Sequence, residues 1–150
     1  MSKIWKPNTV VAAIIETNGK FLIVEETSGG HTVFNQPAGH LDEGESLLNA
    51  VVRETLEETA WHFEPEAITG IYRWPNPDNH CTYLRFCFCG KAVKHEPERE
   101  LDTGIIRAVW LTRDELMAEP SKLRSPMVIT VIDDYLAGIR HPLNLITDLD

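Results

Sequence analysis

Residues 39–61 read GHLDEGESLLNAVVRETLEETAW, in which a loop of glycines and acids leads into a helical pattern. Ser46 is a good N-cap, because its hydroxyl can accept a hydrogen bond from a free N–H in the first helical turn. Apolar side chains then recur at helical spacing, at Leu47, Leu48, Val51, Val52 and Leu56. The pattern predicts a helix from about Ser46 to about Thr59.

Three glutamates of this predicted helix are spaced so that their carboxylates meet. At about 100° per residue, Glu54, Glu57 and Glu58 fall within an arc of about 100° on one helix face. Such carboxylates repel one another unless a cation neutralises them, and carboxylate oxygens are ligands that Mg²⁺ and Mn²⁺ prefer. Arg53 is placed to brace a carboxylate, either that of Glu45 or that of a metal ligand. The spacing therefore predicts a divalent metal site.

The charge of the chain is concentrated around this helix. The net charge is −9, from 14 basic and 23 acidic residues, which argues against broad affinity for a nucleic acid polymer. Residues 42–66 carry eight acids against the single base Arg53, and so supply −7 of the −9. The acids are Asp42, Glu43, Glu45, Glu54, Glu57, Glu58, Glu64 and Glu66. Because most such runs are solvated helix faces, the metal interpretation depends on the spacing and not on the charge.

Turn residues divide the rest of the chain into short apolar runs. Asn18-Gly19 is a strong hairpin signal, because both positions of a type I′ turn need positive φ angles. Strands are expected at residues 9–15, 20–25, 31–35, 68–74, 82–93 and 105–111, and loops at 37–44 and 75–79. The first strand, if exposed at a sheet edge, is a candidate for pairing with another copy, but the oligomeric state is not fixed by the sequence.

Two further helices are predicted toward the C-terminus. Thr112 and Glu115 have the spacing of a capping box for a short helix. An amphipathic helix over residues 127–137 is expected to stop at Gly138. Strands interleaved with helices, without a repeat or a linker, predict a single mixed α/β domain over residues 1–150.

The acidic segment resembles the Nudix box, whose pattern is G-x5-E-x7-R-E-U-x-E-E-x-G-U with U an apolar residue. The matching positions are Gly39, Glu45, Arg53, Glu54, Glu57, Glu58 and Trp61. Two positions depart from the pattern, since Thr55 stands where an aliphatic residue is usual and Ala60 replaces the last glycine. Because alanine tolerates a left-handed helix end poorly, we expect an irregularity there. The resemblance implies the Nudix fold, a mixed β-sheet between α-helices.

The resemblance also implies a hydrolase of phosphoanhydride bonds that uses Mg²⁺, for which Mn²⁺ can substitute. The backbone carbonyl of Ala38 and the side chains of Glu57 and Glu58 would coordinate the principal metal. Glu54 would bind a further metal or orient the attacking water. The other members of the implied catalytic set are Arg53 and Glu45. Family members often add an acid from a later loop, for which the candidates here are Glu98, Glu100 and Asp102.

Outside the box, four stretches are similar to the NudJ-type phosphatase subgroup, at residues 21–27, 35–41, 84–86 and 123–126. This resemblance implies release of phosphate from nucleoside di- and triphosphates and from pyrophosphates of thiamine or its pyrimidine precursor. The aromatic residues that could stack on a substrate ring are Phe34, Tyr72, Trp74 and Tyr83. Each is more often a core residue, and Trp74, just before a turn, is favoured. Arg85 and Arg124 are the candidates for phosphate binding.

Other functions remain open at this point. Some family members that act on ADP-ribose carry a proline about fifteen residues past the box, and Pro75 and Pro77 lie near that spacing. An ADP-ribose or other nucleoside diphosphate-sugar pyrophosphatase is therefore the alternative. A non-catalytic nucleotide sensor would be expected to lose box glutamates, which are all present. An isopentenyl diphosphate isomerase would need further catalytic residues, and this sequence offers no cysteine in a convincing position for that role.

The composition is ordinary for a globular domain, with 43% hydrophobic and 25% charged residues. No long apolar run follows Met1 to Pro7, so neither a signal peptide nor a membrane anchor is expected, and a cytoplasmic location is predicted. Cys81, Cys87 and Cys89 alternate with apolar residues and are interpreted as strand thiols in a reducing compartment. The expected partner is a small phosphorylated substrate, without nucleic acid polymers or membranes.

Overall fold

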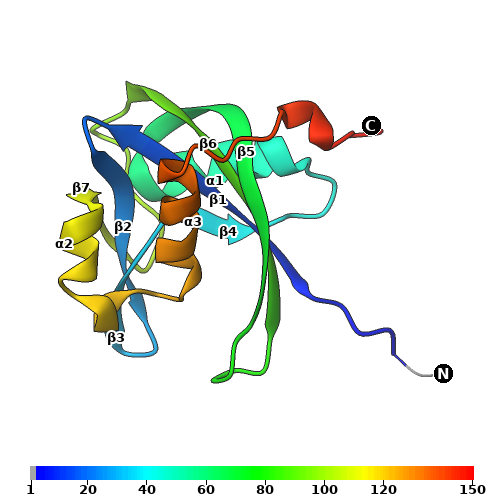
Figure 1. The fold of residues 1–150 in the computed structure, drawn as a ribbon, viewed down its shortest axis with the longest axis horizontal. Coiled ribbons are helices and arrows are strands. Elements are labelled where there is room, and N and C mark those ends of the chain that lie inside the picture. The colour runs from blue at the N-terminus through cyan, green and yellow to red at the C-terminus, as the bar shows by residue number, and fades with distance from the viewer. Residues whose placement is uncertain (1–2) are drawn as a thin grey trace.

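The computed structural model describes residues 3–150 as a mixed β-sheet with helices on both faces (Figure 1). The strands are β1 (Asn8–Thr17), β2 (Lys20–Ser28), β3 (His31–Asn35), β4 (Ala38–His40), β5 (Trp61–Pro75), β6 (Thr82–His95) and β7 (Ile105–Thr112). The helices are α1 (Leu47–Thr59), α2 (Arg113–Met117) and α3 (Met127–Leu136), with short 3-10 turns η1 (Pro120–Lys122) and η2 (Leu143–Leu145). The predicted α/β architecture is confirmed.

Strand β1 is the centre of the sheet. The strand order is β3-β2-β1-β6-β5, with β4 pairing with β1 and β7 pairing with β2. β1 runs parallel to β6, and the other pairs are antiparallel. Residues Val10 to Ile15 are buried on both faces, which explains why this strand reads as a continuous apolar run. β1 therefore lies inside the sheet and is not an exposed edge strand, which was the condition for its pairing with another copy.

The two faces of β1 belong to two hydrophobic clusters. Val11, Ala13 and Ile15 pack with Ala50 and Val51 of α1 on one side. The alternate residues of β1 pack with apolar side chains of α3, which covers the other side of the sheet in Figure 1. Because successive side chains of β1 point to opposite faces of the sheet, α1 and its glutamates are held against one face of β1. None of the helices over residues 3–150 has the length and apolar character needed to cross a membrane.

The predicted hairpin is confirmed. Asn18 and Gly19 have φ angles of 52° and 80°, as a type I′ turn requires, and the strands close around them with Thr17 opposite Lys20. The hairpin is short, because only Glu16 and Thr17 of β1 pair with β2. The preceding part of β1 pairs with β4 and β6. Cys87 and Cys89 are buried strand thiols as predicted. Cys81 is half-buried and lies just before β6, so its assignment to a strand was wrong.

Two predicted boundaries were wrong. The expected loop at 37–44 contains strand β4, because Ala38 to His40 pair with β1 although two of the three residues are alanine and glycine. The strand expected at 68–74 begins at Trp61, directly after α1. Its first half was hidden by Glu64 and Pro65, which are tolerated because β5 is an edge strand with a bulge at Pro65.

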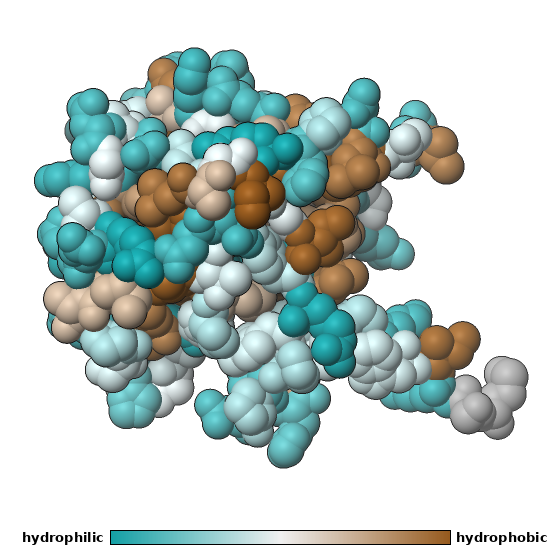
Figure 2. Space-filling view, in the orientation of Figure 1, coloured by the Kyte–Doolittle hydropathy of each residue, from teal (hydrophilic) through white to brown (hydrophobic). Residues whose placement is uncertain are grey.

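The face of the molecule in Figure 2 is mostly hydrophilic, with apolar residues in small separate groups. Large apolar side chains that remain exposed include Trp5, Ile71 and Leu149. Isolated exposed apolar residues of this kind are normal on a folded domain.

Candidate active site

Helix α1 begins and ends where the sequence predicts. The Ser46 hydroxyl accepts a hydrogen bond of 3.1 Å from the backbone N–H of Asn49, and the helix ends at Thr59. Ala60 follows with φ of 63°, which confirms the expected left-handed irregularity. Thr55 is fully buried, and its hydroxyl donates to the carbonyl of Val51 at 2.7 Å, so its polar atom is satisfied within the helix.

Arg53 holds the acidic side chains around it in one network. Its Nε donates to Glu45 at 2.6 Å, and its Nη1 donates to both Glu54 and Glu57 at 2.9 Å. Nη2 reaches Glu45 at 3.0 Å and the carbonyl of His40 at 3.2 Å. The hydrogen bond from Arg53 lowers the pKa of Glu45. One guanidinium therefore orients two carboxylates of α1 and ties them to the loop before the helix.

A carboxylate from outside α1 joins these glutamates. Glu54, Glu57 and Asp102 each place one oxygen within 4.8 Å of the others. The backbone N–H of Asp102 donates to the carbonyl of Glu57 at 3.0 Å, which fixes the loop before β7 against the end of α1. Of the three later acids that the sequence left open, this group contains Asp102 and neither Glu98 nor Glu100.

Glu58 occupies a different position, between α1 and β4. Its carboxylate accepts a hydrogen bond of 3.0 Å from the backbone N–H of Ala38, and its side chain is 9% exposed. Burial raises the pKa of Glu58 to about 9, against the lowering effect of the Ala38 hydrogen bond. Burial also raises the pKa of Glu54. Two of the predicted ligands, Glu58 and Ala38, are thus brought into direct contact with each other.

Gly39 is required by the close approach of β4 to α1. A Cβ atom at Gly39 would lie 2.1 Å from the carboxyl carbon of Glu54. A side chain at this position would push Glu54 out of its place beside Arg53. The first glycine of the pattern therefore makes room for the first glutamate of the helix.

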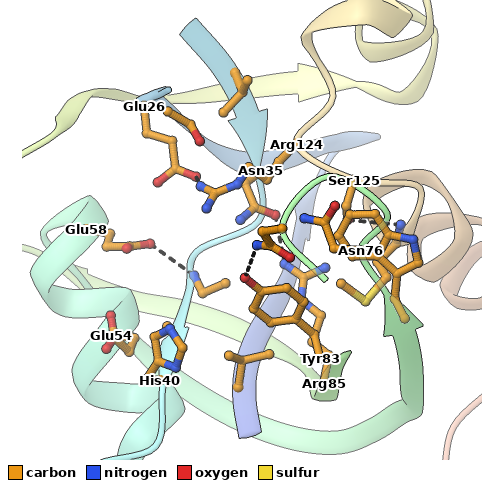
Figure 3. A pocket seen from close by; sticks show the side chains of 18 of the residues that line it. Glu26, Asn35, His40, Glu54, Glu58, Asn76, Tyr83, Arg85, Arg124 and Ser125 are labelled. Atoms are coloured by element: carbon orange, nitrogen blue, oxygen red, sulfur yellow. Dashed lines mark hydrogen bonds and ion pairs between the residues drawn. The ribbon is translucent and has the colours of Figure 1, made fainter. Parts of the chain in front are cut away.

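Glu54 of this acidic group and Glu58 line a cavity of about 750 Å³. Figure 3 shows Glu54 and Glu58 of α1 on one side of it and Tyr83 and Arg85 of β6 on the other. The η1–α3 connection contributes Arg124, and the β5–β6 turn contributes further polar side chains. The cavity thus has an acidic wall and a wall of aromatic and basic residues, although these segments are far apart in the sequence.

The predicted ring-binding residue Trp74 lines this cavity. Its ring stacks on that of Tyr83, with 6.1 Å between centroids and 24° between planes. Tyr83 accepts a hydrogen bond of 3.0 Å from the amide of Asn79 in the β5–β6 turn. The other two aromatic candidates lie elsewhere, since Phe34 is in the core and Tyr72 donates to Asp134 of α3 at 2.7 Å.

The two predicted phosphate-binding arginines line the same cavity in different states. Arg85 is 2% exposed and donates to Gln36 at 3.1 Å and to Asn35 at 2.8 Å. Arg124 has a 44% exposed side chain and donates to Glu26 at 2.6 Å. Arg85 is therefore enclosed by neutral amides, whereas Arg124 forms an ion pair with Glu26 at the rim of the cavity.

Sequence reasoning assigned no role to Glu26, Asn35 or Gln36. All three lie within the stretches that resemble the NudJ-type subgroup, so that resemblance was the available signal. Nothing in the local pattern showed that they meet Arg85 or Arg124, because their contacts span 49 to 98 residues.

Comparison with known proteins identifies the family. The model of the NUDIX domain matches residues 5–130 of the chain. The chain belongs to the Nudix family. The phosphatase NudJ of Escherichia coli K12 is 38% identical over 146 residues, which cover 97% of this Nudix chain and 94% of the relative. The phosphatase NudJ of Shigella flexneri matches to the same extent.

Solved structures agree with this assignment. A Nudix hydrolase from Nitrosomonas europaea is 50% identical, with a TM-score of 0.93 over 95% of this chain and 97% of its own. A MutT Nudix hydrolase from Burkholderia pseudomallei has a TM-score of 0.74 at 20% identity, over 87% of this chain and 98% of its own, and so shares the fold. The protein is a Nudix hydrolase, which confirms the family and the enzyme class indicated by the acidic segment.

Proposed function

We propose that this Nudix hydrolase uses Mg²⁺ to hydrolyse a phosphoanhydride bond in nucleoside di- and triphosphates or related small pyrophosphates. The observation that carries the proposal is the convergence of Glu54, Glu57 and Asp102 beside a cavity that has arginines on its opposite wall. The likeness to phosphatase NudJ supports a phosphatase activity. Pyrophosphates of the thiamine pyrimidine type are included because four stretches of the sequence resemble the NudJ-type subgroup.

The residues of the acidic wall fit a small divalent cation. Carboxylate oxygens within 4.8 Å of one another are hard donors of the kind that Mg²⁺ and Mn²⁺ take. Glu54, Glu57 and Asp102 would hold the ion, with Glu58 and the carbonyl of Ala38 beside them as the remaining ligands that the Nudix pattern implies. A bound cation there would lower the pKa of the attacking water and offset charge that develops at phosphorus.

The other residues of the site position these groups. Arg53 and Glu45 hold Glu54 and Glu57 at fixed angles, so the carboxylates need little reorganisation when a cation arrives. Trp74 and Tyr83 offer an aromatic wall for the ring of a substrate, and Arg124 offers guanidinium donors for its phosphates. The metal, the scissile phosphate and the ring would then occupy successive parts of one cavity.

A panel of phosphoanhydrides tests the proposal. Purified protein should release orthophosphate from at least one nucleoside di- or triphosphate when Mg²⁺ is present and not when EDTA replaces it. AMP with ribose 5-phosphate from ADP-ribose would instead favour the pyrophosphatase alternative. No turnover of any compound with Mg²⁺ or Mn²⁺ would contradict the proposal and favour a non-catalytic sensor.

The matched control for the metal site is a glutamate outside the network. Glu57→Gln should lower activity steeply at limiting Mg²⁺, whereas Glu43→Gln, at an exposed position of the loop before α1, should leave it unchanged. Equal activity in the two variants would contradict the assignment of Glu57.

A cytoplasmic location stays a prediction from the sequence.

A further inference from the structure

Arg85 is a buried cation whose side-chain partners are neutral. Its Nη1 donates to Oε1 of Gln36 and its Nη2 donates to Oδ1 of Asn35. The salt bridges of residues 3–150, taken to 4.0 Å, do not include Arg85. A buried charge is costly to maintain, so a guanidinium held in this way by two amides calls for an explanation beyond packing.

The hydrogen bonds around Arg85 permit a single orientation of both amides. A guanidinium can only donate, so each amide must turn its oxygen toward Arg85. The Nε2 of Gln36 donates to the backbone carbonyl of Val128 in α3 at 2.9 Å, and a carbonyl can only accept. Asn35 has its Oδ1 on Arg85 at 2.8 Å, and its Nδ2 is therefore turned away from Arg85.

Asn35 lines the cavity beside Arg124. The carbonyl of Phe34 accepts the backbone N–H of Arg124 at 2.9 Å, and Phe34 also forms a bridge with Leu123. This pairing brings the η1–α3 connection against the end of β3, and Figure 3 shows Asn35 and Arg124 together, across the cavity from Glu58. The amide nitrogen of Asn35 and the half-exposed guanidinium of Arg124 thus form one group of hydrogen-bond donors.

We propose that Asn35 binds a phosphoryl oxygen of the substrate through Nδ2, and that Arg85 is the positioning residue that keeps this nitrogen directed into the cavity. The inference rests on the proposed function, in that the substrate carries phosphate. A phosphoryl oxygen only accepts hydrogen bonds and carries negative charge, so it suits two donors next to each other. A substrate group that donates at this place would find no acceptor on Asn35 and is selected against.

The test is Asn35→Asp, which keeps the size of the side chain and keeps an oxygen for Arg85. The probe is methylenediphosphonate with Mg²⁺, a pyrophosphate analogue that has phosphoryl oxygens and no ring, titrated by calorimetry. We expect about tenfold weaker binding or more, because a donor becomes a carboxylate that repels the probe. The unfolding midpoint should be unchanged or higher, since the carboxylate pairs with Arg85. Asn49→Asp, an exposed position of α1 outside the cavity, adds the same charge and should bind as the wild type does.

Unchanged binding of methylenediphosphonate by folded Asn35→Asp would overturn the proposal, because a purely structural role for Asn35 predicts that result. Asn35→Ser is the second variant should the first not fold, and it should weaken binding without an added charge. The positioning role predicts that Arg85→Lys weakens binding of the probe, and that adding Asn35→Ser to Arg85→Lys weakens it little further. Losses of binding free energy that are fully additive in the double variant would refute this role. The probe is not hydrolysed, so these results are independent of whether any substrate is turned over.

Discussion

Replacing Glu58 by glutamine should stabilise the metal-free protein at neutral pH. Burial raises the pKa of this carboxyl to about 9 from an ordinary value of 4.5. Between these two values the folded state keeps a proton that the unfolded chain has lost, so stability falls as the pH rises. The contribution of the neutral carboxyl is fully present below pH 4.5 and is lost progressively up to about pH 9. Glutamine stays neutral throughout and can still accept the N–H of Ala38.

The size of this effect follows from the shift in pKa. Each pH unit between the two pKa values is worth about 1.4 kcal/mol of unfolding free energy. At pH 7.5, which is three units above 4.5, the variant should exceed the wild type by up to about 4 kcal/mol. Near pH 5 the difference should fall below about 1 kcal/mol. Mg²⁺ should reduce the difference at neutral pH, because a cation that takes Glu58 as a further ligand stabilises the wild type more than the variant.

Urea denaturation in EDTA at pH 5.0 and 7.5 measures this difference directly. Glu43→Gln, on the exposed loop before α1, is the control for loss of one negative charge, and it should show no comparable dependence on pH. A difference between Glu58→Gln and the wild type that is the same at both pH values would refute the reasoning, because it would mean that Glu58 does not hold its proton in the folded state.

Three further predictions concern the walls of the cavity. Gly39→Ala would place a Cβ 2.1 Å from the carboxyl carbon of Glu54, so turnover should fall at least about tenfold. The free energy of unfolding, measured by urea denaturation, should change by less than about 1 kcal/mol, because the flexible end of Glu54 can move. Glu57→Gln should raise the Mg²⁺ concentration for half-maximal activity by about 10- to 100-fold, measured by metal titration of turnover. Trp74→Ala should raise KM by about tenfold with a smaller change in kcat, because stacking on a substrate ring is worth about 1–3 kcal/mol. An unchanged KM would remove Trp74 from the substrate wall.

The acidic wall could be predicted because it depends on local geometry. The bounds of α1, its cap at Ser46 and the placement of Glu54 beside Glu57 follow from a rise and rotation that are the same in every helix. The predicted meeting of Glu58 with these two was not found, because Glu58 binds the backbone N–H of Ala38 and Asp102 takes the third place. The left-handed end at Ala60 was predictable for the same reason, since a helix terminus has few conformations. The network of Arg53 with Glu45 and Glu57 spans at most eight residues, so a helical wheel and a short loop were enough to suggest it.

The opposite wall could not be predicted in the same way. Asn35 meets Arg85 only because β1 pairs in parallel with β6 in one register, in which Val10 lies opposite Arg85. A shift of one residue would turn Arg85 to the other face of the sheet. Arg124 reaches Glu26 across 98 residues, through a connection that pairs with β3. No spacing within either segment indicates these contacts.

This division has a consequence for inferring function within the family. The MutT Nudix hydrolase from Burkholderia pseudomallei shares the fold at 20% identity, so the scaffold tolerates replacement of most residues. Most of the residues proposed to hold a cation lie on one helix and can be recognised as a short pattern, with Asp102 added from outside it. The residues proposed to face the rest of the substrate, such as Trp74, Asn35 and Arg124, line the cavity from three separate segments. Local spacing therefore indicates the reaction class. If the proposed substrate wall is correct, strand register determines the choice of substrate, and Asn35 and Arg85 are the pair to compare first among relatives.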